Sequence, residues 1–211
     1  MIANAARVAY SPYADFDGQA PVTSSGIVAD IPAEPQIERR LAELAPYRGF
    51  AYRDALTGLW NRRMFEERLA AEIERPSERA LRRFSMLLVD LDDLGRINQR
   101  HGHAEGDRVL ARTAAFLVAN LRPDDVCCRI GGDEFAAVLP DAGAMDAQAL
   151  VAHLRGALAT ANRRAAPAAW LSFGTATFPS DARNGSGLVR RADAEMYDDK
   201  ARGKEATPRD F

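Results

Sequence analysis

The sequence has very little cysteine and histidine, and it contains no long apolar run. Among 211 residues there are two cysteines, adjacent at Cys127 and Cys128, and three histidines. This scarcity excludes a disulfide-stapled scaffold, and the histidines have no cysteine or carboxylate near them at zinc-ligand spacing. No apolar segment approaches the roughly 20 residues that a membrane helix needs. We therefore expect no membrane insertion, and cysteines that serve as reduced packing residues.

The sequence also lacks an excess of charge of either sign. Its formal net charge is −2 at pH 7, which offers no basic surface for nucleic acid or for an anionic membrane. Residues 1–7 have neither the basic start nor the sustained apolar stretch of an export signal. These features predict a cytoplasmic protein with no nucleic-acid partner. A redox switch at Cys127 and Cys128 is the alternative to a packing role, but neighbouring strand residues point to opposite faces.

The chain divides into an irregular beginning and a regular remainder. Prolines and glycines interrupt the first 35 residues, a composition typical of a flexible tail. Ile37, Leu41 and Leu44 have helical spacing and predict a short helix closed by Pro46. We assign residues 1–45 to a flexible N-terminal tail and short helical stalk, and residues 46–211 to a globular domain.

From about residue 50 the apolar pattern alternates between helical and strand periods. The expected elements are a helix from about 61 to 76, a strand over 86–89, a long helix stopped by Pro123, strands over 126–130 and 135–139, a helix through 150–158, a strand over 170–178 and a helix over 188–201. Helices and strands are interleaved, but a hairpin lies in the middle. The order predicts an α+β fold, a central mixed sheet flanked by helices, rather than a doubly wound parallel sheet.

Two glycines and two carboxylates, Gly131-Gly132-Asp133-Glu134, lie between the two central strands. A glycine-bearing turn between two strands is typical of a β-hairpin. The turn needs glycine, but it has no need of adjacent acids. Glycine lets a phosphate-bearing ligand approach the backbone, and acids beside it can hold the cation that accompanies the phosphate.

A second acidic segment, Asp90-Leu91-Asp92-Asp93, follows the strand expected at 86–89. Asp92 or Asp93 is expected to cap the next helix. Capping does not explain Asp90, which ends a strand built to be buried. Carboxylates at a strand's end, facing the acidic turn of a neighbouring strand, would form an all-oxygen cation site that favours Mg²⁺ or Mn²⁺ over zinc.

These segments resemble the GGDEF-domain diguanylate cyclases. The resemblance runs in family order from about residue 50 to 205 and includes, besides the hairpin and the acidic segment, residues 54–63, 97–107, 172–174 and 192–204. It identifies residues 46–211 as a GGDEF catalytic domain. It implies the nucleotidyl-cyclase-like (ferredoxin-like) fold, with the GGDEF motif at a β-hairpin turn.

The resemblance also implies roles for individual residues. Asp90 and Asp133 would bind Mg²⁺ (or Mn²⁺), two ions per active site, with the Leu91 carbonyl as a third oxygen. Glu134 would activate the attacking 3′-hydroxyl or support the metals, and the sequence leaves these alternatives open. The residues implied to bind the substrate are Leu94, Asn98, Asp107, Gly132, Lys200 and Lys204.

Among the substrate-binding residues, Asn98 and Asp107 would read guanine, and Lys200 and Lys204 would hold the β- and γ-phosphates. Each has a purely structural alternative. Asn98 and Asp107 could cap helices, and the lysines could form a solvated last turn that suits the helix dipole. The occurrence of all four together in family order favours the functional interpretation.

The reaction implied by the resemblance is the condensation of two GTP into cyclic di-GMP with release of two pyrophosphates. One domain binds one GTP, so the two-fold symmetric product implies a homodimer. Arg122 and Asp125 have the RxxD form and the spacing of the family's product-inhibition site for cyclic di-GMP, with Arg129 as a further contact. A helix end followed by a proline stop is the alternative for this segment.

Several positions depart from the family pattern. Leu94-Gly95 replaces the usual Phe-Lys, and Gln99 replaces an aspartate. Asp198 and Asp199 are expected to add negative charge beside the lysine at position 200. These changes predict slower turnover or weaker GTP binding. They leave as the alternative function a catalytically weak or inactive GGDEF-like module that binds GTP or cyclic di-GMP as a sensor.

Overall fold

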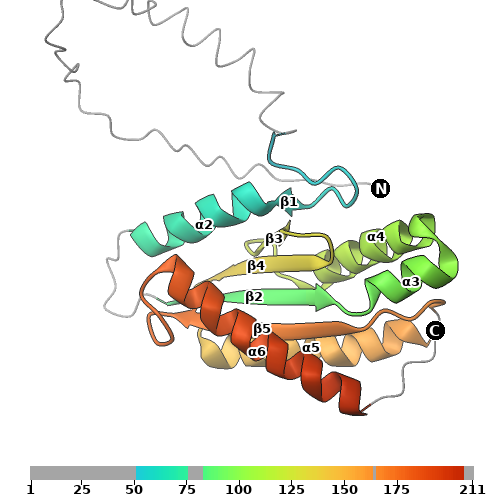
Figure 1. Ribbon diagram of the computed structural model, residues 1–211. Helices are drawn as coiled ribbons and strands as arrows, with labels where there is room; N and C mark the ends of the chain where they lie inside the picture. Colours follow the sequence, from blue (N-terminus) through green and yellow to red (C-terminus); the bar gives the residue numbers. More distant parts are fainter. Residues whose placement is uncertain (1–50, 76–82, 164, 207–211) are drawn as a thin grey trace, which may run out of the picture. The chain divides into compact units, whose positions relative to one another are not determined.

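The computed structural model describes residues 51–75, 83–163 and 165–206 (Figure 1). The short helix expected around residues 37–44 lies outside these residues. The elements are β1 (Trp60–Asn61), α2 (Arg62–Glu74), β2 (Phe84–Leu91), α3 (Leu94–His101), α4 (His103–Asn120), β3 (Val126–Arg129), β4 (Glu134–Pro140), α5 (Ala144–Asn162), β5 (Leu171–Phe178) and α6 (Gly185–Ala206). None of these helices is long and apolar enough to cross a membrane.

The strands form one five-stranded sheet in the order β1-β3-β4-β2-β5. β1 runs parallel to β3, and the β3–β4, β4–β2 and β2–β5 pairs are antiparallel. β2 is buried along its whole length between β4 and β5. The α+β fold with a central mixed sheet is therefore confirmed, and so is the hairpin formed by β3 and β4.

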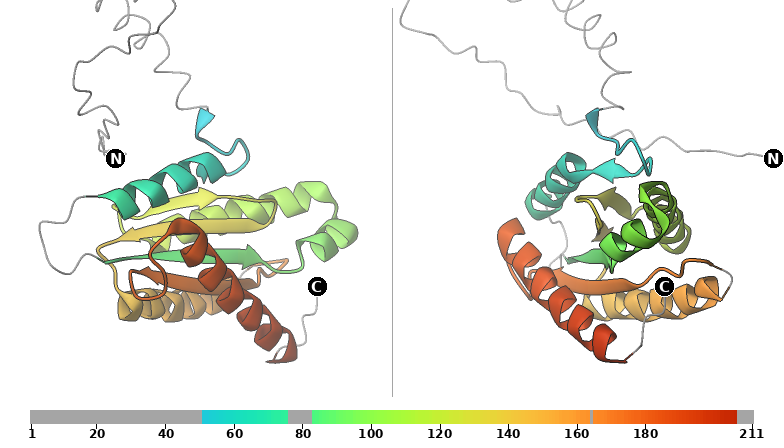
Figure 2. Two further views of the ribbon diagram at one scale, coloured as in Figure 1. Left: turned by 60° about the vertical axis from the view of Figure 1, so that its left-hand side comes forward. Right: turned by 45° about the vertical axis from the view of Figure 1, so that its right-hand side comes forward.

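Helices cover both faces of the sheet (Figure 2). Because strand side chains alternate, Leu87 and Val89 pack with α3, α4 and α5, whereas Met86 and Leu88 pack with α2 and α6 on the other face. Cys127 and Cys128 belong to these two opposite clusters, and both are free thiols. Burial raises the pKa of the Cys127 thiol to about 12, so it is protonated and unreactive at neutral pH. These observations favour the packing role.

The local helix signals agree with the structure in part. Asn61 begins α2 as expected, since its side chain accepts a hydrogen bond from the Met64 amide at 3.3 Å. The prediction that Asp92 or Asp93 caps the next helix is confirmed for the position of Asp93, but not for a capping hydrogen bond. Asp93 holds the N-cap position of α3 with φ 58°, but its side chain makes no cap hydrogen bond. Asp92 is buried elsewhere, against Ser172 of β5.

Backbone N–H groups on the outer edge of β5 donate hydrogen bonds to carboxylates of α6 and not to another strand. The backbone N–H of Phe173 donates to Asp199 at 2.9 Å, and that of Thr175 donates to Glu195 at 3.2 Å. Both acceptors lie on α6, which packs closely on the strand at Gly174. A Cβ atom at Gly174 would lie 2.0 Å from the Ala192 carbonyl oxygen. These contacts fix the helix that carries Lys200.

Candidate active site

The carboxyl end of β2 lies between the acidic hairpin turn and the beginning of β5. Asp90 is paired in register with Glu134 on one side and with Ser172 on the other. The Leu91 amide donates to the Asp133 carbonyl at 2.9 Å, which joins the acidic segment to the turn directly. The structure therefore confirms that the acidic end of this strand faces the acidic turn of its neighbour.

Two carboxylates and one ammonium group meet at this strand end. The Asp90 and Asp92 side chains are 12% and 1% exposed, and Lys200 Nζ of α6 lies 2.6 Å from Asp90 Oδ1 and 3.7 Å from Asp92 Oδ1. The Ser172 hydroxyl donates to Asp92, with its oxygen 2.9 and 3.0 Å from the two carboxylate oxygens. Lys200 is thus a partner of the acidic cluster, which argues against a solvated last turn at this position.

Electrostatics keep Lys200 charged. Burial alone would lower its pKa, but the hydrogen bond to Asp90 and the charge of Asp90 outweigh burial. The carboxylates of Asp92 and Asp133 act in the same direction, so the pKa of Lys200 is raised above its ordinary value. The Lys204 side chain lies outside the described part of the chain, and its role remains a prediction.

The donor set at this strand end fits a hard divalent cation. Over residues 51–75, 83–163 and 165–206, no group of three or more histidine, cysteine, aspartate or glutamate side chains is arranged to hold a metal. The expected set needs only Asp90, Asp133 and the Leu91 carbonyl, and the Leu91–Asp133 main-chain bond holds their segments together. The Lys200 ammonium acts as a stand-in that shows this position attracting positive charge. All three donors are oxygens, as Mg²⁺ and Mn²⁺ prefer.

Gly131 of the hairpin turn makes room for Glu134. A Cβ atom at Gly131 would lie 2.3 Å from Glu134 Oε2, so a larger residue here would displace the carboxylate. The Glu134 side chain is 42% exposed and forms an ion pair with Arg62 of α2 at 3.7 Å. Arg62 also donates to the Ile130 carbonyl at 2.7 Å. Sequence reasoning did not assign Arg62 to the site, because nothing local indicates a contact across 68 residues.

Asn98 and Asp107 lie within α3 and α4, so the alternative that they cap helices is wrong. Asn98 Oδ1 is buried, and no hydrogen-bond partner reaches it from the described residues. A Cβ atom at Gly106 would lie 1.9 Å from this oxygen, so only glycine leaves space for it. A buried acceptor without a partner is costly in a folded protein, which favours a ligand contact here. Asp107 is exposed.

The beginning of α3 fits the expected contact with an anionic group. Leu94 is its first residue, and the amides of Arg96 and Ile97 donate to the Asp93 carbonyl at 2.9 and 3.1 Å. Helix geometry provides no acceptor within the helix for the two amides before them, those of Leu94 and Gly95. At Gly95, a Cβ atom would meet no heavy atom within 4 Å. A side chain could therefore begin at this position without a clash at its Cβ atom.

The expectation that Asp199 adds charge beside Lys200 is wrong. Asp199 is buried, accepts from Arg155 at 2.5 Å and receives the Phe173 amide. Its charge is compensated in the contact between α5, β5 and α6. Asp198 is exposed on α6.

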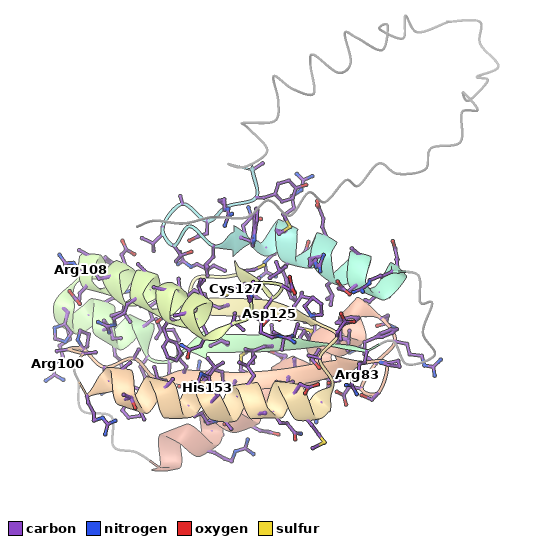
Figure 3. All side chains as sticks on the ribbon, turned by 180° about the vertical axis from the view of Figure 1, so that it is seen from behind. Arg83, Arg100, Arg108, Asp125, Cys127 and His153 are labelled. Carbon is purple, nitrogen blue, oxygen red and sulfur yellow. The ribbon has the colours of Figure 1, made fainter. Side chains whose placement is uncertain are left out.

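Arg122 and Asp125 of the RxxD segment are bonded to each other. The Asp125 side chain is 1% exposed and accepts from the Arg122 side chain and amide, each at 2.8 Å, whereas the Arg122 side chain is 56% exposed. In Figure 3, Asp125 lies well apart from Arg100, and Arg100 is the residue near the end of α3. Arg129 faces inward instead, donating to Asp54 at 3.1 Å and to the Gly132 carbonyl at 2.7 Å. This arrangement argues against Arg129 as a ligand contact of the RxxD site.

Asp54 supports the site through Arg129, a distant partner that the sequence did not reveal. Its carboxylate accepts from the Thr57 amide at 2.8 Å and from the Thr57 hydroxyl at 2.6 Å, as well as from Arg129. Through Arg129 it is connected to the hairpin turn at Gly132. The Asp-x-x-Thr spacing indicates the local turn, but no local signal indicates the arginine.

Comparison with known proteins matches the family that the sequence resembles. The sequence model of the family described as "Diguanylate cyclase, GGDEF domain" matches residues 51–206. The response regulator PleD of Caulobacter vibrioides is 33% identical over 161 residues, 74% of this chain and 35% of PleD. Diguanylate cyclase TpbB of Pseudomonas aeruginosa is 35% identical over 151 residues, 70% of this chain and 34% of TpbB. The chain thus spans less than half the length of these curated relatives.

Solved structures extend the match to the fold. A TpbB variant from P. aeruginosa that comprises only the GGDEF domain has a TM-score of 0.65 at 34% identity, covering 71% of this chain and 89% of that chain. The coiled coil and GGDEF domain of DgcB from Caulobacter crescentus, in complex with c-di-GMP, has a TM-score of 0.68 at 26% identity, covering 80% and 91%. The chain therefore belongs to the GGDEF-domain family of diguanylate cyclases.

Proposed function

We propose that this protein is a diguanylate cyclase, which condenses two GTP into cyclic di-GMP and two pyrophosphates across a homodimer. The observation that carries the proposal is the meeting of Asp90, Leu91 and Asp133 at the carboxyl end of β2, beside Lys200. Family membership supports the same conclusion, since TpbB is named a diguanylate cyclase and the DgcB structure contains c-di-GMP.

Asp90, Asp133 and the Leu91 carbonyl would hold Mg²⁺ (or Mn²⁺), two ions per active site. Bound there, the ions would neutralise charge that builds on the α-phosphate and on the departing pyrophosphate. Lys200 and Lys204 would bind the β- and γ-phosphates. The exposed Gly132 and the amides at Leu94 would let these phosphates approach the backbone.

Asn98 and Asp107 would select guanine. The buried Asn98 oxygen would gain a hydrogen bond from the base, and the Asp107 carboxylate would accept from the guanine N1 and N2 donors. Adenine lacks this pair of donors, so binding it would leave acceptors unpaired. Glu134 would take the proton of the attacking 3′-hydroxyl or support the metal ions. Two domains face to face would aim each hydroxyl at the other protomer's α-phosphate.

The direct test is chromatography of the products after incubation with GTP and Mg²⁺. We expect cyclic di-GMP from the unaltered protein, none from Asp133→Ala, and the usual amount from Glu66→Ala. Glu66 is an exposed acid on α2, so this control removes the same charge outside the site. Product from the Asp133 variant would contradict the metal role of this residue.

A sensor that binds nucleotide without turnover is the second candidate, and Gly95 is the observation that favours it. Where the family pattern has lysine, this chain offers a backbone amide and open space. A folded, dimeric protein that forms no product but binds GTP or cyclic di-GMP in calorimetry would support the sensor. Such a result would rule out the cyclase.

We further propose that Arg122 and Asp125 form a product-inhibition site. The Arg122 guanidinium is exposed, and the buried Asp125 holds it in place. Arginine can bind a phosphate through two hydrogen bonds and can stack on guanine.

A further inference from the structure

Lys200 already occupies the carboxylate that the proposed function assigns to a metal ion. Its Nζ lies 2.6 Å from Asp90 Oδ1, with the lysine side chain 32% exposed and that of Asp90 12% exposed. The contact spans 110 residues and joins α6 to the end of β2. Asp92, whose Oδ1 lies 3.7 Å from this ammonium, accepts hydrogen bonds from Ser172.

A divalent cation and this ammonium group cannot both bind Asp90 Oδ1 without strong repulsion. Mg²⁺ binds carboxylate oxygen at about 2.0–2.1 Å, so the two positive centres would lie only a few ångströms apart. At such a separation in a partly buried site, the two positive charges repel each other, and water screens them only in part. Each positive centre therefore weakens the binding of the other at Asp90.

The lysine side chain is the part that can move. The backbone of α6 is fixed against β5 at Gly174 and through the carboxylates of Asp199 and Glu195. The four-carbon stem of lysine, by contrast, rotates freely and carries three donors that suit a phosphate. Movement of the ammonium therefore needs no movement of the helix.

We propose that Lys200 competes with the divalent cation for Asp90, so that tight cation binding requires a nucleotide phosphate to draw the lysine away. The inference rests on the proposed function, because it takes Asp90 as a metal ligand and Lys200 as a phosphate ligand. Lys200 then couples the two binding events, and each ligand strengthens the binding of the other.

Manganese alone, without nucleotide, tests the competition. Free Mn²⁺ is measured by electron paramagnetic resonance during titration of the full chain and of the variants Lys200→Met, Lys200→Gln, Arg202→Met and Asp90→Asn. Removing the lysine should tighten Mn²⁺ binding about three- to tenfold, the range expected for a partly exposed charged hydrogen bond. Arg202 lies on the same helix, 70% exposed, and pairs with Asp199 at 3.6 Å, so its variant removes the same charge at a carboxylate other than Asp90.

Equal affinity in the unaltered protein and both Lys200 variants would overturn the inference. An equal gain in Arg202→Met would also overturn it, because the effect would then be general charge. Mn²⁺ binding that survives in Asp90→Asn would show that the ion binds elsewhere. Thermal unfolding identifies any variant that fails to fold, and either Lys200 variant alone suffices. The cyclase assay is independent: absence of product with intact competition contradicts only the proposed function.

Discussion

Asp54 connects the turn that begins the described domain to the acidic hairpin. Its partners are Thr57, in the same turn, and Arg129, which also holds the Gly132 carbonyl. Burial alone would raise the pKa of Asp54, but the hydrogen bonds from Thr57 and Arg129 outweigh it and lower the pKa below its ordinary value. A lowered pKa means that the folded state favours the ionised form. This stabilisation is fully present above the pKa of an unfolded aspartate and is lost as the pH falls through the lower pKa of the folded state.

Asp54→Asn should therefore reduce the free energy of unfolding by about 1–3 kcal/mol at pH 7. The difference from the unaltered protein should shrink as the solution is acidified, because the unaltered carboxylate is then protonated too. Urea denaturation at neutral and acidic pH measures the difference in the free energy of unfolding at each pH. Asp124→Asn, a change at an exposed aspartate, is the control. A deficit that is the same at both pH values would contradict the role of the ionised pair.

Arg122 gives a second prediction at the scale of one residue. Arg122→Ala should raise the cyclic di-GMP concentration needed for half-maximal inhibition at least tenfold, since it removes the exposed phosphate-binding group. Arg122→Lys is the matched variant. It keeps the charge but loses bidentate geometry. Its half-inhibitory concentration of cyclic di-GMP should therefore lie between those of the unaltered protein and of Arg122→Ala. Unaltered inhibition in the alanine variant would remove the assignment.

At the scale of elements, the contact between β5 and α6 controls where Lys200 lies. Gly174 is the point of closest approach, where an added Cβ would meet backbone atoms of Ala192 and Met196 at 2.0 and 2.5 Å. Backbone atoms of a packed helix cannot give way as a flexible side chain can. The helix would have to shift, and its lysine would shift with it.

Gly174→Ala should thus lower the free energy of unfolding by about 1–3 kcal/mol and reduce turnover. The control is Gly156→Ala in α5, where a Cβ would meet nothing within 4 Å. That variant should be neutral or should stabilise by up to about 1 kcal/mol, because alanine favours a helix. Calorimetric unfolding measures both. A stable, fully active Gly174 variant would show that α6 is not held at this point.

Local pattern was sufficient to predict most elements and the hairpin. Glycines and acids between two apolar runs indicate the turn, and prolines indicate the helix ends. The predictions that failed concern residues whose partners lie far away in the chain. Asp92 accepts a hydrogen bond from Ser172 instead of capping a helix. Arg155 compensates the charge of Asp199, and Arg129 donates to Asp54 instead of reaching the RxxD site. The spacing of residues along one segment carries no information on which distant group will compete for a carboxylate.

At the scale of the whole molecule, catalysis by the proposed route requires two copies of the chain. Each domain would supply one site, and the reaction joins two nucleotides head to tail. We propose that residues 1–45, which precede the family match at 51–206, promote this pairing.

Removal of residues 1–45 should then lower the molecular mass in solution from that of a dimer to that of a monomer, with most cyclase activity lost. Light scattering and product chromatography on the same samples test this, over a range of protein concentrations. Recovery of activity at high concentration would be expected, since association is a mass-action equilibrium. Unchanged mass and activity would contradict a role of this segment in pairing.

The site at the end of β2 has a consequence for how the protein folds. The neighbours of Asp90 are Glu134, Ser172 and Lys200, and Lys200 is 110 residues away in the sequence. Such non-local contacts form late and only once the loops between them have closed. A partly folded chain should therefore offer no cation site. Ligands that bind only the completed site would draw the folding equilibrium toward the native state.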